Sequence, residues 1–211
     1  IGFPVTVGYG MTECGPLISY AFPEVHKPHS VGMAMSFLKV RIDSEDPENI
    51  PGEIQVKGEN VMLEYYKNHE ATAETLSSEG WLKTGDLGVM DSDGFIYIKG
   101  RSKNMILGSS GQNIYPEEIE SRMANLPYVQ ECLALEKDGR LLMLIYPDLE
   151  AADAQNKGED FQTWLAERME ENRMVLNQNL PAYCQVSKIL LRAEPFEKTP
   201  TQKIKRFLYR V

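Results

Sequence analysis

The sequence changes character along the stretch Gly94-Phe95-Ile96-Tyr97-Ile98-Lys99-Gly100-Arg101-Ser102-Lys103. The turn signal Asp91-Ser92-Asp93-Gly94 leads into it, and its first part is predicted to be a strand. The polar residues after Gly100 are typical of a link between two regions. We therefore expect one domain over residues 1–100 and a second over residues 101–211.

The region before this link is mainly a β pattern. Leu38, Val40 and Ile42 alternate with polar residues, which predicts a half-buried strand, and Gly52-Glu53-Ile54-Gln55-Val56-Lys57-Gly58 alternates in the same way between two glycines. A short helix is expected between residues 68 and 77. Strands at this spacing, separated by turn signals, predict a β-barrel-like subdomain or a sandwich.

The region after the link mixes helices and strands. Proline followed by acidic residues predicts a helix over residues 116–124, and apolar periodicity predicts a longer one over 160–177. The remaining apolar runs predict strands over residues 129–136, 140–146 and 185–191. The fold class expected for this part is α+β.

Composition excludes several classes of function. The 211 residues include 31 acidic and 22 basic ones, and the net charge of -9 argues against nucleic acid as the main partner. An anionic ligand needs only a local positive site. No apolar run reaches the length of a membrane span, and no signal peptide is seen. Three widely spaced cysteines fit reduced thiols in a cytoplasmic protein.

The segment Gly8-Tyr9-Gly10-Met11-Thr12-Glu13 could contact a nucleotide. Glycine allows a ligand to approach the backbone closely, and an aromatic ring can stack on a base. A hydroxyl can donate to phosphate, and a carboxylate can hold Mg²⁺. An ordinary strand followed by a turn would explain the same residues.

Three later residues are candidates for the same site. Asp86, in Trp81-Leu82-Lys83-Thr84-Gly85-Asp86-Leu87-Gly88, could accept both hydroxyls of a ribose, although aspartate beside glycine is also common in turns. Arg101 could reach an anion or a ribose with its fork of donors. Lys203 lies in a loop rich in proline and threonine, and could stabilise charge that develops on a phosphate. A solvated linker and a solvated basic tail are the alternatives for these last two.

Together, in this order, the four segments resemble the signature motifs of the adenylate-forming superfamily, which contains acyl-CoA synthetases, luciferases and peptide-synthetase adenylation domains. The resemblance covers nearly the whole chain. Residues 103–107 and 113–120 are most similar to the long-chain fatty acid–CoA ligases. The resemblance implies the β-rich end of a large adenylation domain, followed by a small mobile C-terminal domain.

The resemblance also implies roles for the first segment. Tyr9 would stack against adenine, with Gly10 beside it in the nucleotide-binding turn. Thr12 would contact phosphate, and Glu13 would hold Mg²⁺ and so take part in catalysis.

Further roles follow for the later segments. Asp86 would bind the ribose hydroxyls, and Arg101 would also reach the ribose. Lys103 matches the hinge of the small domain, and Lys203 matches the lysine that assists adenylation. In the family's reaction a fatty acid attacks the α-phosphate of MgATP to give acyl-AMP and pyrophosphate, and the thiol of CoA then attacks the acyl-AMP.

The sequence departs from the family pattern in three ways. Gln202 stands where a glycine usually precedes the lysine, and one additional residue before Gly111 predicts a bulged loop at Gly108-Ser109-Ser110. The phosphate-binding loop and most of the acyl pocket would lie before Tyr9. We therefore expect a C-terminal portion, inactive without the N-terminal part of its own chain.

Two other interpretations stay open. One is an adenylation domain that loads a carrier protein, and the other is a nucleotide-binding module without catalysis. A fatty acyl substrate would be compatible with peripheral membrane contact, although no amphipathic basic helix demands it.

Overall fold

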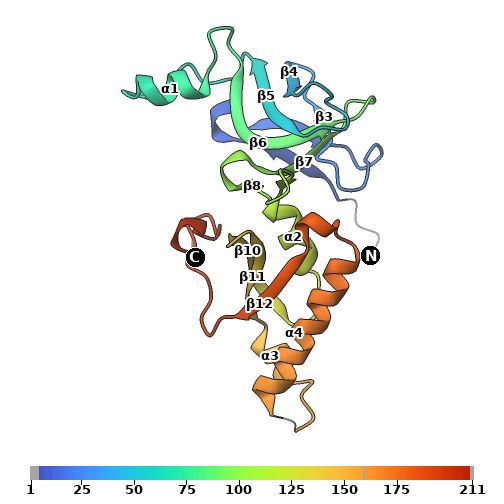
Figure 1. Cartoon of the computed structure of the whole chain (residues 1–211). Helices are drawn as coiled ribbons and strands as arrows, with labels where there is room; N and C mark the ends of the chain where they lie inside the picture. Colours follow the sequence, from blue (N-terminus) through green and yellow to red (C-terminus); the bar gives the residue numbers. More distant parts are fainter. Residues whose placement is uncertain (1–4, 159, 210–211) are drawn as a thin grey trace. The chain divides into compact units, whose positions relative to one another are not determined.

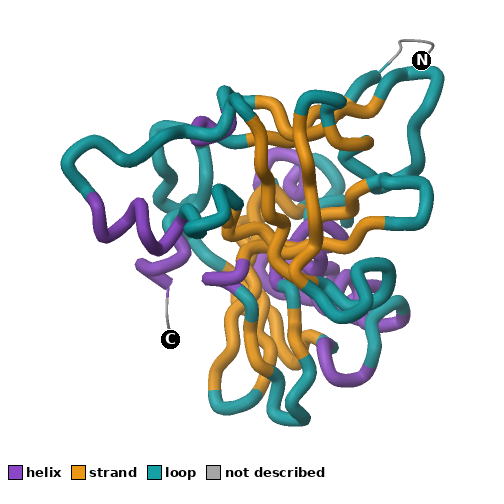
Figure 2. The backbone as a smooth tube through the Cα atoms, turned by 90° about the horizontal axis from the view of Figure 1, so that it is seen from above, coloured by secondary structure: helices purple, strands orange, loops and turns teal. Residues whose placement is uncertain are grey.

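The computed structural model describes residues 5–158 and 160–209, and the chain divides into two compact units, Ile1–Lys103 and Asn104–Val211. Figure 1 shows the elements of each unit along the chain, and Figure 2 distinguishes strands from helices and loops.

Among the described residues, no helix is both long and apolar enough to cross a membrane. The three cysteines are free and buried.

The first unit consists mainly of two antiparallel sheets. One has the order β1-β2-β3 and the other the order β4-β5-β6-β7, and the isolated bridge between Met33 and Phe95 links them. In the described residues β4 and β7 form opposite edges of an open sheet, so the barrel-like subdomain expected from the sequence is not a closed barrel. The strands are Val7–Gly10 (β1), Leu17–Ala21 (β2), Met33–Ala34 (β3), Leu38–Asp43 (β4), Gly52–Gly58 (β5), Leu82–Met90 (β6) and Ile96–Arg101 (β7).

The alternating sequences form the core of this unit. Leu38 and Ile42 of β4 point inward, and Ile54 and Val56 of β5 are fully buried beside Leu82 of β6. The period-2 pattern therefore predicted both strands and their apolar face, although Gln55 on the other face of β5 is also buried. The helix expected at residues 68–77 is α1 (His69–Thr75), and the side chain of its N-cap residue Asn68 accepts a hydrogen bond from the backbone N–H of Ala71.

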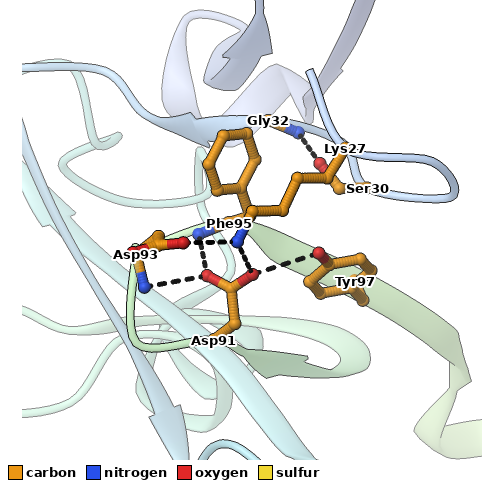
Figure 3. A network of polar contacts seen from close by, with 7 residues as sticks. All are labelled: Lys27, Ser30, Gly32, Asp91, Asp93, Phe95 and Tyr97. Atoms are coloured by element: carbon orange, nitrogen blue, oxygen red, sulfur yellow. Dashed lines mark hydrogen bonds and ion pairs between the residues drawn. The ribbon is translucent and has the colours of Figure 1, made fainter. Parts of the chain in front are cut away.

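A polar cluster fixes the loop after β2 to the turn between β6 and β7 (Figure 3). The Lys27 amine lies 2.7 Å from Asp91 and 2.6 Å from Asp93, and its Nζ is 4.7 Å from the centre of the Phe95 ring. Tyr97 donates a hydrogen bond to Asp91 over 3.1 Å. This cluster therefore lies at the turn that connects β6 to β7.

The second unit has a three-stranded sheet of order β10-β11-β12 with two helices packed against it. The pair β10–β11 is antiparallel and the pair β11–β12 is parallel. The elements are β8 (Ile106–Leu107), β9 (Asn113–Ile114), α2 (Pro116–Met123), β10 (Val129–Lys137), β11 (Arg140–Pro147), α3 (Leu149–Asp153), α4 (Phe161–Gln178) and β12 (Val186–Leu191).

The core of the second unit lies between the sheet and the two long helices. Met143 and Ile145 of β11 are buried against Met123 of α2 and Met169 of α4. Proline at the start of α2 and an Asp160 cap at the start of α4 set the positions where the helices begin. The helices and strands expected here are confirmed, and the fold class is α+β.

Candidate functional site

Tyr9, Asp86 and Arg101 meet in the first unit although they are far apart in the sequence. The Tyr9 hydroxyl donates a hydrogen bond to Oδ2 of Asp86 over 2.8 Å, and Nε of Arg101 lies 2.8 Å from Oδ1 of the same carboxylate. Asp86 and Arg101 are directly opposite each other on β6 and β7. Asp86 is 8% exposed, whereas 47% of the Arg101 side chain is exposed, so the cluster reaches from the core to the surface.

A β-bulge directs Asp86 toward this cluster. The register of β5 against β6 shifts between Glu53 and Gln55, opposite Thr84-Gly85-Asp86. Gly85 has φ +73°, which favours glycine, and its N–H donates to the Glu53 carboxylate over 3.1 Å. The Thr84 hydroxyl accepts from the Asp86 N–H at 3.1 Å. Thr84-Gly85-Asp86 therefore lies inside a strand, and the alternative that Asp86 is an ordinary turn residue is wrong.

The environment keeps the Tyr9 phenol neutral. Burial, followed by the nearby Asp86 carboxylate, raises the pKa of Tyr9 well above its ordinary value. Tyr9 therefore acts as a hydrogen-bond donor to Asp86 at physiological pH. A carboxylate has about four lone-pair sites, so Asp86 can accept further hydrogen bonds from a ligand while it keeps both protein partners.

Gly10 has a structural role that is independent of any ligand. A Cβ atom at Gly10 would lie 1.8 Å from the carbonyl oxygen of Pro16, which is far inside the contact distance. The backbone N–H of Met11 donates to that same carbonyl over 2.8 Å. The close approach of β1 to the residues before β2 therefore requires glycine here. Thr12, two residues after Gly10, is exposed.

Glu13 lies in a 3-10 turn (Thr12–Cys14) and has a partner that the sequence did not indicate. The Tyr65 hydroxyl donates to Oε1 of Glu13 over 2.8 Å. Burial and this carboxylate together raise the pKa of Tyr65. Tyr65 lies fifty-two residues away in the chain, so no local pattern could have identified this contact.

The carboxylate of Glu13 fits one form of magnesium binding. In the described residues no group of three or more His, Cys, Asp or Glu side chains could hold a metal ion. Mg²⁺ is commonly bound through one or two carboxylates together with substrate phosphates. Glu13 is partly exposed and could supply such a single carboxylate.

The residues expected around the hinge lie where the two units divide. Lys103 is exposed in a 3-10 turn (Ser102–Asn104) and is the last residue of the first unit. The segment expected to bulge is the tip of the β8–β9 hairpin, where the Gly108 N–H donates to the Gln112 carbonyl over 2.8 Å. Gly111 has φ +82° in this tip.

Lys203 is exposed in the second unit, near the end of a hairpin. The Thr199 N–H donates to the Lys203 carbonyl over 2.8 Å, and the Lys203 N–H donates to the Thr199 hydroxyl over 3.2 Å. Gln202, directly before it, has φ +63°, the left-handed backbone that glycine adopts readily. The turn therefore keeps a glycine-like conformation although glutamine occupies it.

The chain is similar to several known proteins. Residues 1–66 match the family of AMP-binding enzymes. A long-chain-fatty-acid–CoA ligase of Escherichia coli O6:H1 is 43% identical over 133 residues, which cover 61% of this chain and 23% of that protein.

Two solved structures of one Bacillus subtilis protein, O-succinylbenzoate CoA synthetase, are also similar. The complex with the acyl-adenylate intermediate OSB-AMP has a TM-score of 0.78 and 29% identity, over 100% of this chain and 42% of that one. The complex with ATP and magnesium has a TM-score of 0.76 and 29% identity, over 98% and 41%. The chain thus spans less than half the length of these relatives.

Proposed function

We propose that this chain is the C-terminal portion of an AMP-forming acyl-CoA synthetase, because residues 1–66 match the AMP-binding enzymes and the chain is similar to CoA ligases. The single observation that carries this proposal is the cluster of Tyr9, Asp86 and Arg101, joined by two contacts of 2.8 Å. A buried carboxylate between a phenol and an exposed guanidinium is suited to a ligand that presents both hydroxyl groups and negative charge.

The first unit would bind the nucleotide. Asp86 accepts hydrogen bonds from the ribose hydroxyls, and Arg101 donates to the ribose from its exposed side. Tyr9 orients Asp86 through its hydroxyl, and only the small exposed part of this residue, 8%, would face adenine. Thr12 is exposed beside this strand and donates to a phosphate oxygen.

Magnesium, when bound, would neutralise charge on the phosphates of ATP. Glu13 would hold it through its carboxylate, and Tyr65 keeps that carboxylate oriented by its hydrogen bond of 2.8 Å. This is a positioning role for Tyr65, which the sequence did not suggest.

The reaction would have two steps. In the first, an oxygen of the substrate carboxylate forms a bond to the α-phosphorus of ATP, and the bond to pyrophosphate breaks. Lys203 stabilises the negative charge that grows in this step. In the second, the thiol of CoA releases its proton and its sulfur attacks the acyl carbon, the bond from that carbon to AMP breaks, and a thioester forms.

The division between the two units supports a hinge at Lys103. It falls between residues 103 and 104, at a short polar turn. Rotation about this turn would exchange the groups that face the nucleotide between the two steps. The second unit would be the mobile C-terminal domain.

We propose a fatty acid as the carboxylate substrate. The E. coli relative described above is named a long-chain-fatty-acid–CoA ligase, and it is 43% identical to this chain over 133 residues. The second relative is named for succinylbenzoate, so the acid must be tested directly. The experiment is ATP–pyrophosphate exchange by the full-length protein with fatty acids of several lengths and with aromatic acids. Exchange that requires a fatty acid supports the proposal, whereas exchange with aromatic acids alone overturns the substrate assignment.

The acceptor of the acyl group is also tested with the full-length protein. Transfer of the acyl group to CoA, measured as thioester formation, is the expected result. Transfer to a phosphopantetheine carrier protein alone would identify a carrier-loading adenylation domain, and the absence of exchange with any acid would identify a nucleotide-binding module.

A further inference from the structure

The hairpin that carries Lys203 is a small structure of its own. Lys198 and Ile204 form an isolated β-bridge across it, and the Gln202 N–H donates to the Thr199 carbonyl over 2.9 Å to close the turn. Lys203 lies between this turn and the bridge. The position of its backbone therefore depends on how the two ends of the hairpin are held.

Apolar burial is uneven along this hairpin. Phe196, before it, is 4% exposed, but Phe207 and Leu208, after it, are 66% and 46% exposed. Ile204 is partly buried. Phe196 packs edge to face on Tyr209 with ring centres 5.0 Å apart, so aromatic packing joins the two ends of the segment and polar contacts fix the residues between them.

One ion pair anchors the first strand of the hairpin. The Lys198 amine lies 2.5 Å from Oε1 of Glu131 on β10, and the Phe196 N–H donates to Oε2 of the same carboxylate over 2.9 Å. Only 12% of the Glu131 side chain is exposed. One carboxylate thus binds both the backbone and the side chain at this end.

A second ion pair anchors the chain just after Lys203. Arg206 forms an ion pair with Glu120 of α2, whose side chain is 15% exposed. Glu120 also accepts from the Ala134 N–H over 2.6 Å, and Arg206 donates to the Ala134 carbonyl over 3.4 Å. Arg206 is therefore fixed to both α2 and β10, and Figure 1 shows the C-terminal segment beside β10.

The contacts around Arg206 extend toward the start of the second unit. Glu117, one turn before Glu120 on α2, lies 3.9 Å from Arg206 and accepts a hydrogen bond of 2.6 Å from Asn104. Asn104 follows directly after Lys103. The acidic face of α2 thus contacts both the residue beside the proposed hinge and the segment of the lysine.

We propose that Glu120 and Glu131 are positioning residues that fix the hairpin in place, so that Lys203 reaches the reacting phosphate in a defined geometry. This inference rests on the proposed function. The two carboxylates are mostly buried and bind cations on either side of Lys203, so neutralising either one frees one end of the hairpin. Small displacements of a catalytic group are costly, since about 1 Å can reduce a rate by roughly 10²-fold.

The hairpin provides its own control. Glu197 and Lys205 form a third ion pair across it at 3.4 Å, but the Glu197 side chain is 67% exposed. Exposed pairs are screened by water and contribute little to holding a structure. Glu197→Gln makes the same chemical change as Glu120→Gln and Glu131→Gln in the same hairpin.

The first part of the test measures the anchoring directly in the 211-residue chain. Amide hydrogen exchange is compared between wild type and the three variants. We expect Glu120→Gln and Glu131→Gln to increase exchange at residues 199 and 203 by about tenfold or more, with protection of β11 retained, and Glu197→Gln to match wild type. Unchanged exchange at residues 199 and 203 in both buried variants overturns the proposal.

The second part separates positioning from general damage in the full-length protein. ATP–pyrophosphate exchange reports the first step, and thioester formation from added acyl-adenylate reports the second. We expect the two buried variants to lose about 10- to 100-fold in the first step and less than about threefold in the second. Equal losses in both steps, or losses no greater than in Glu197→Gln, overturn the proposal.

Lys203→Ala distinguishes this inference from the function on which it rests. If Lys203→Ala retains full pyrophosphate exchange, the role of Lys203 is wrong, and with it the positioning role. If Lys203→Ala abolishes exchange while Glu120→Gln and Glu131→Gln do not, the proposed function stands and only the positioning inference fails.

Discussion

The Tyr9 hydroxyl lies 2.8 Å from the Asp86 carboxylate although seventy-seven residues separate them in the chain. This contact joins β1 of one sheet to β6 of the other within the first unit. Asp86 is thereby held between a buried donor and the exposed guanidinium of Arg101. The same hydrogen bond serves the fold and the proposed nucleotide site, so the two contributions must be separated by experiment.

Tyr9→Phe removes the hydroxyl and keeps the ring. We expect the free energy of unfolding to fall by about 1.5–3 kcal/mol, the usual range for a hydrogen bond to a charged group. Nucleotide affinity should fall by less than about tenfold, because the stacking surface remains. Urea denaturation and AMP titration measure the two effects, and a loss of affinity as large as that of Tyr9→Ala would show that the hydroxyl, and not the ring, binds the ligand.

Gly10→Ala should disrupt the turn between β1 and β2. The new Cβ would lie 1.8 Å from the Pro16 carbonyl, so the backbone must move, at a cost of about 2 kcal/mol or more. Gly94→Ala is the matched control, because its Cβ meets nothing within 4 Å and only the φ of +86° opposes it. That change should cost about 1 kcal/mol. Equal stability of the two variants in urea would contradict the assignment of Gly10 to packing.

The ion pair of Lys27 predicts a defined titration for Asp91. The Lys27 amine lowers the pKa of the Asp91 carboxyl from 3.8 to about 2. A carboxyl group whose pKa is lowered by folding stabilises the folded protein at a pH above its pKa in the unfolded chain. This stability is lost as the pH falls through its pKa in the folded protein. NMR titration should place the Asp91 pKa near 2 in wild type and closer to its ordinary value in Lys27→Met. An Asp91 pKa that is identical in the two proteins would mean that Lys27 does not form the contact.

The left-handed backbone of Gln202 predicts which substitutions its turn accepts. Gln202→Gly relieves the strained conformation but adds freedom to the unfolded chain, so stability should change by less than about 1 kcal/mol. Gln202→Val places a β-branched residue at φ +63° and should cost about 1–3 kcal/mol. Thermal denaturation and hydrogen exchange at Lys203 compare the two, and a valine variant as stable as wild type would contradict this turn geometry.

The sequence predicted the elements whose patterns are local. Alternation at Leu38 and Ile42 and the proline that begins α2 were sufficient for a strand and a helix, because neighbouring residues determine the pattern. The short strand β2 was missed, because five residues interrupted by Ser19 give a weak signal. The α+β class followed from the stronger elements alone.

The candidate site was predicted as a set of motifs, without the contacts between its residues. Asp86 was assigned no strand, because the bulge at Gly85 depends on Glu53 in the neighbouring strand. The contact between Tyr65 and Glu13 joins residues fifty-two positions apart, and nothing near either residue indicates it. Motif order identified the residues, but their geometry depends on pairing between distant segments.

The most direct test of the proposed function is ATP–pyrophosphate exchange by the full-length protein, comparing Asp86→Asn with Asp91→Asn. Both changes neutralise an ion-paired aspartate. Asp86 lies at one end of the paired region of β6 and β7, and Asp91 lies just beyond its other end. We predict acid-dependent exchange in wild type, a loss of roughly 100-fold in Asp86→Asn, and a change of less than about threefold in Asp91→Asn. Full exchange in Asp86→Asn, or no exchange by wild type with any carboxylic acid, would contradict the assignment.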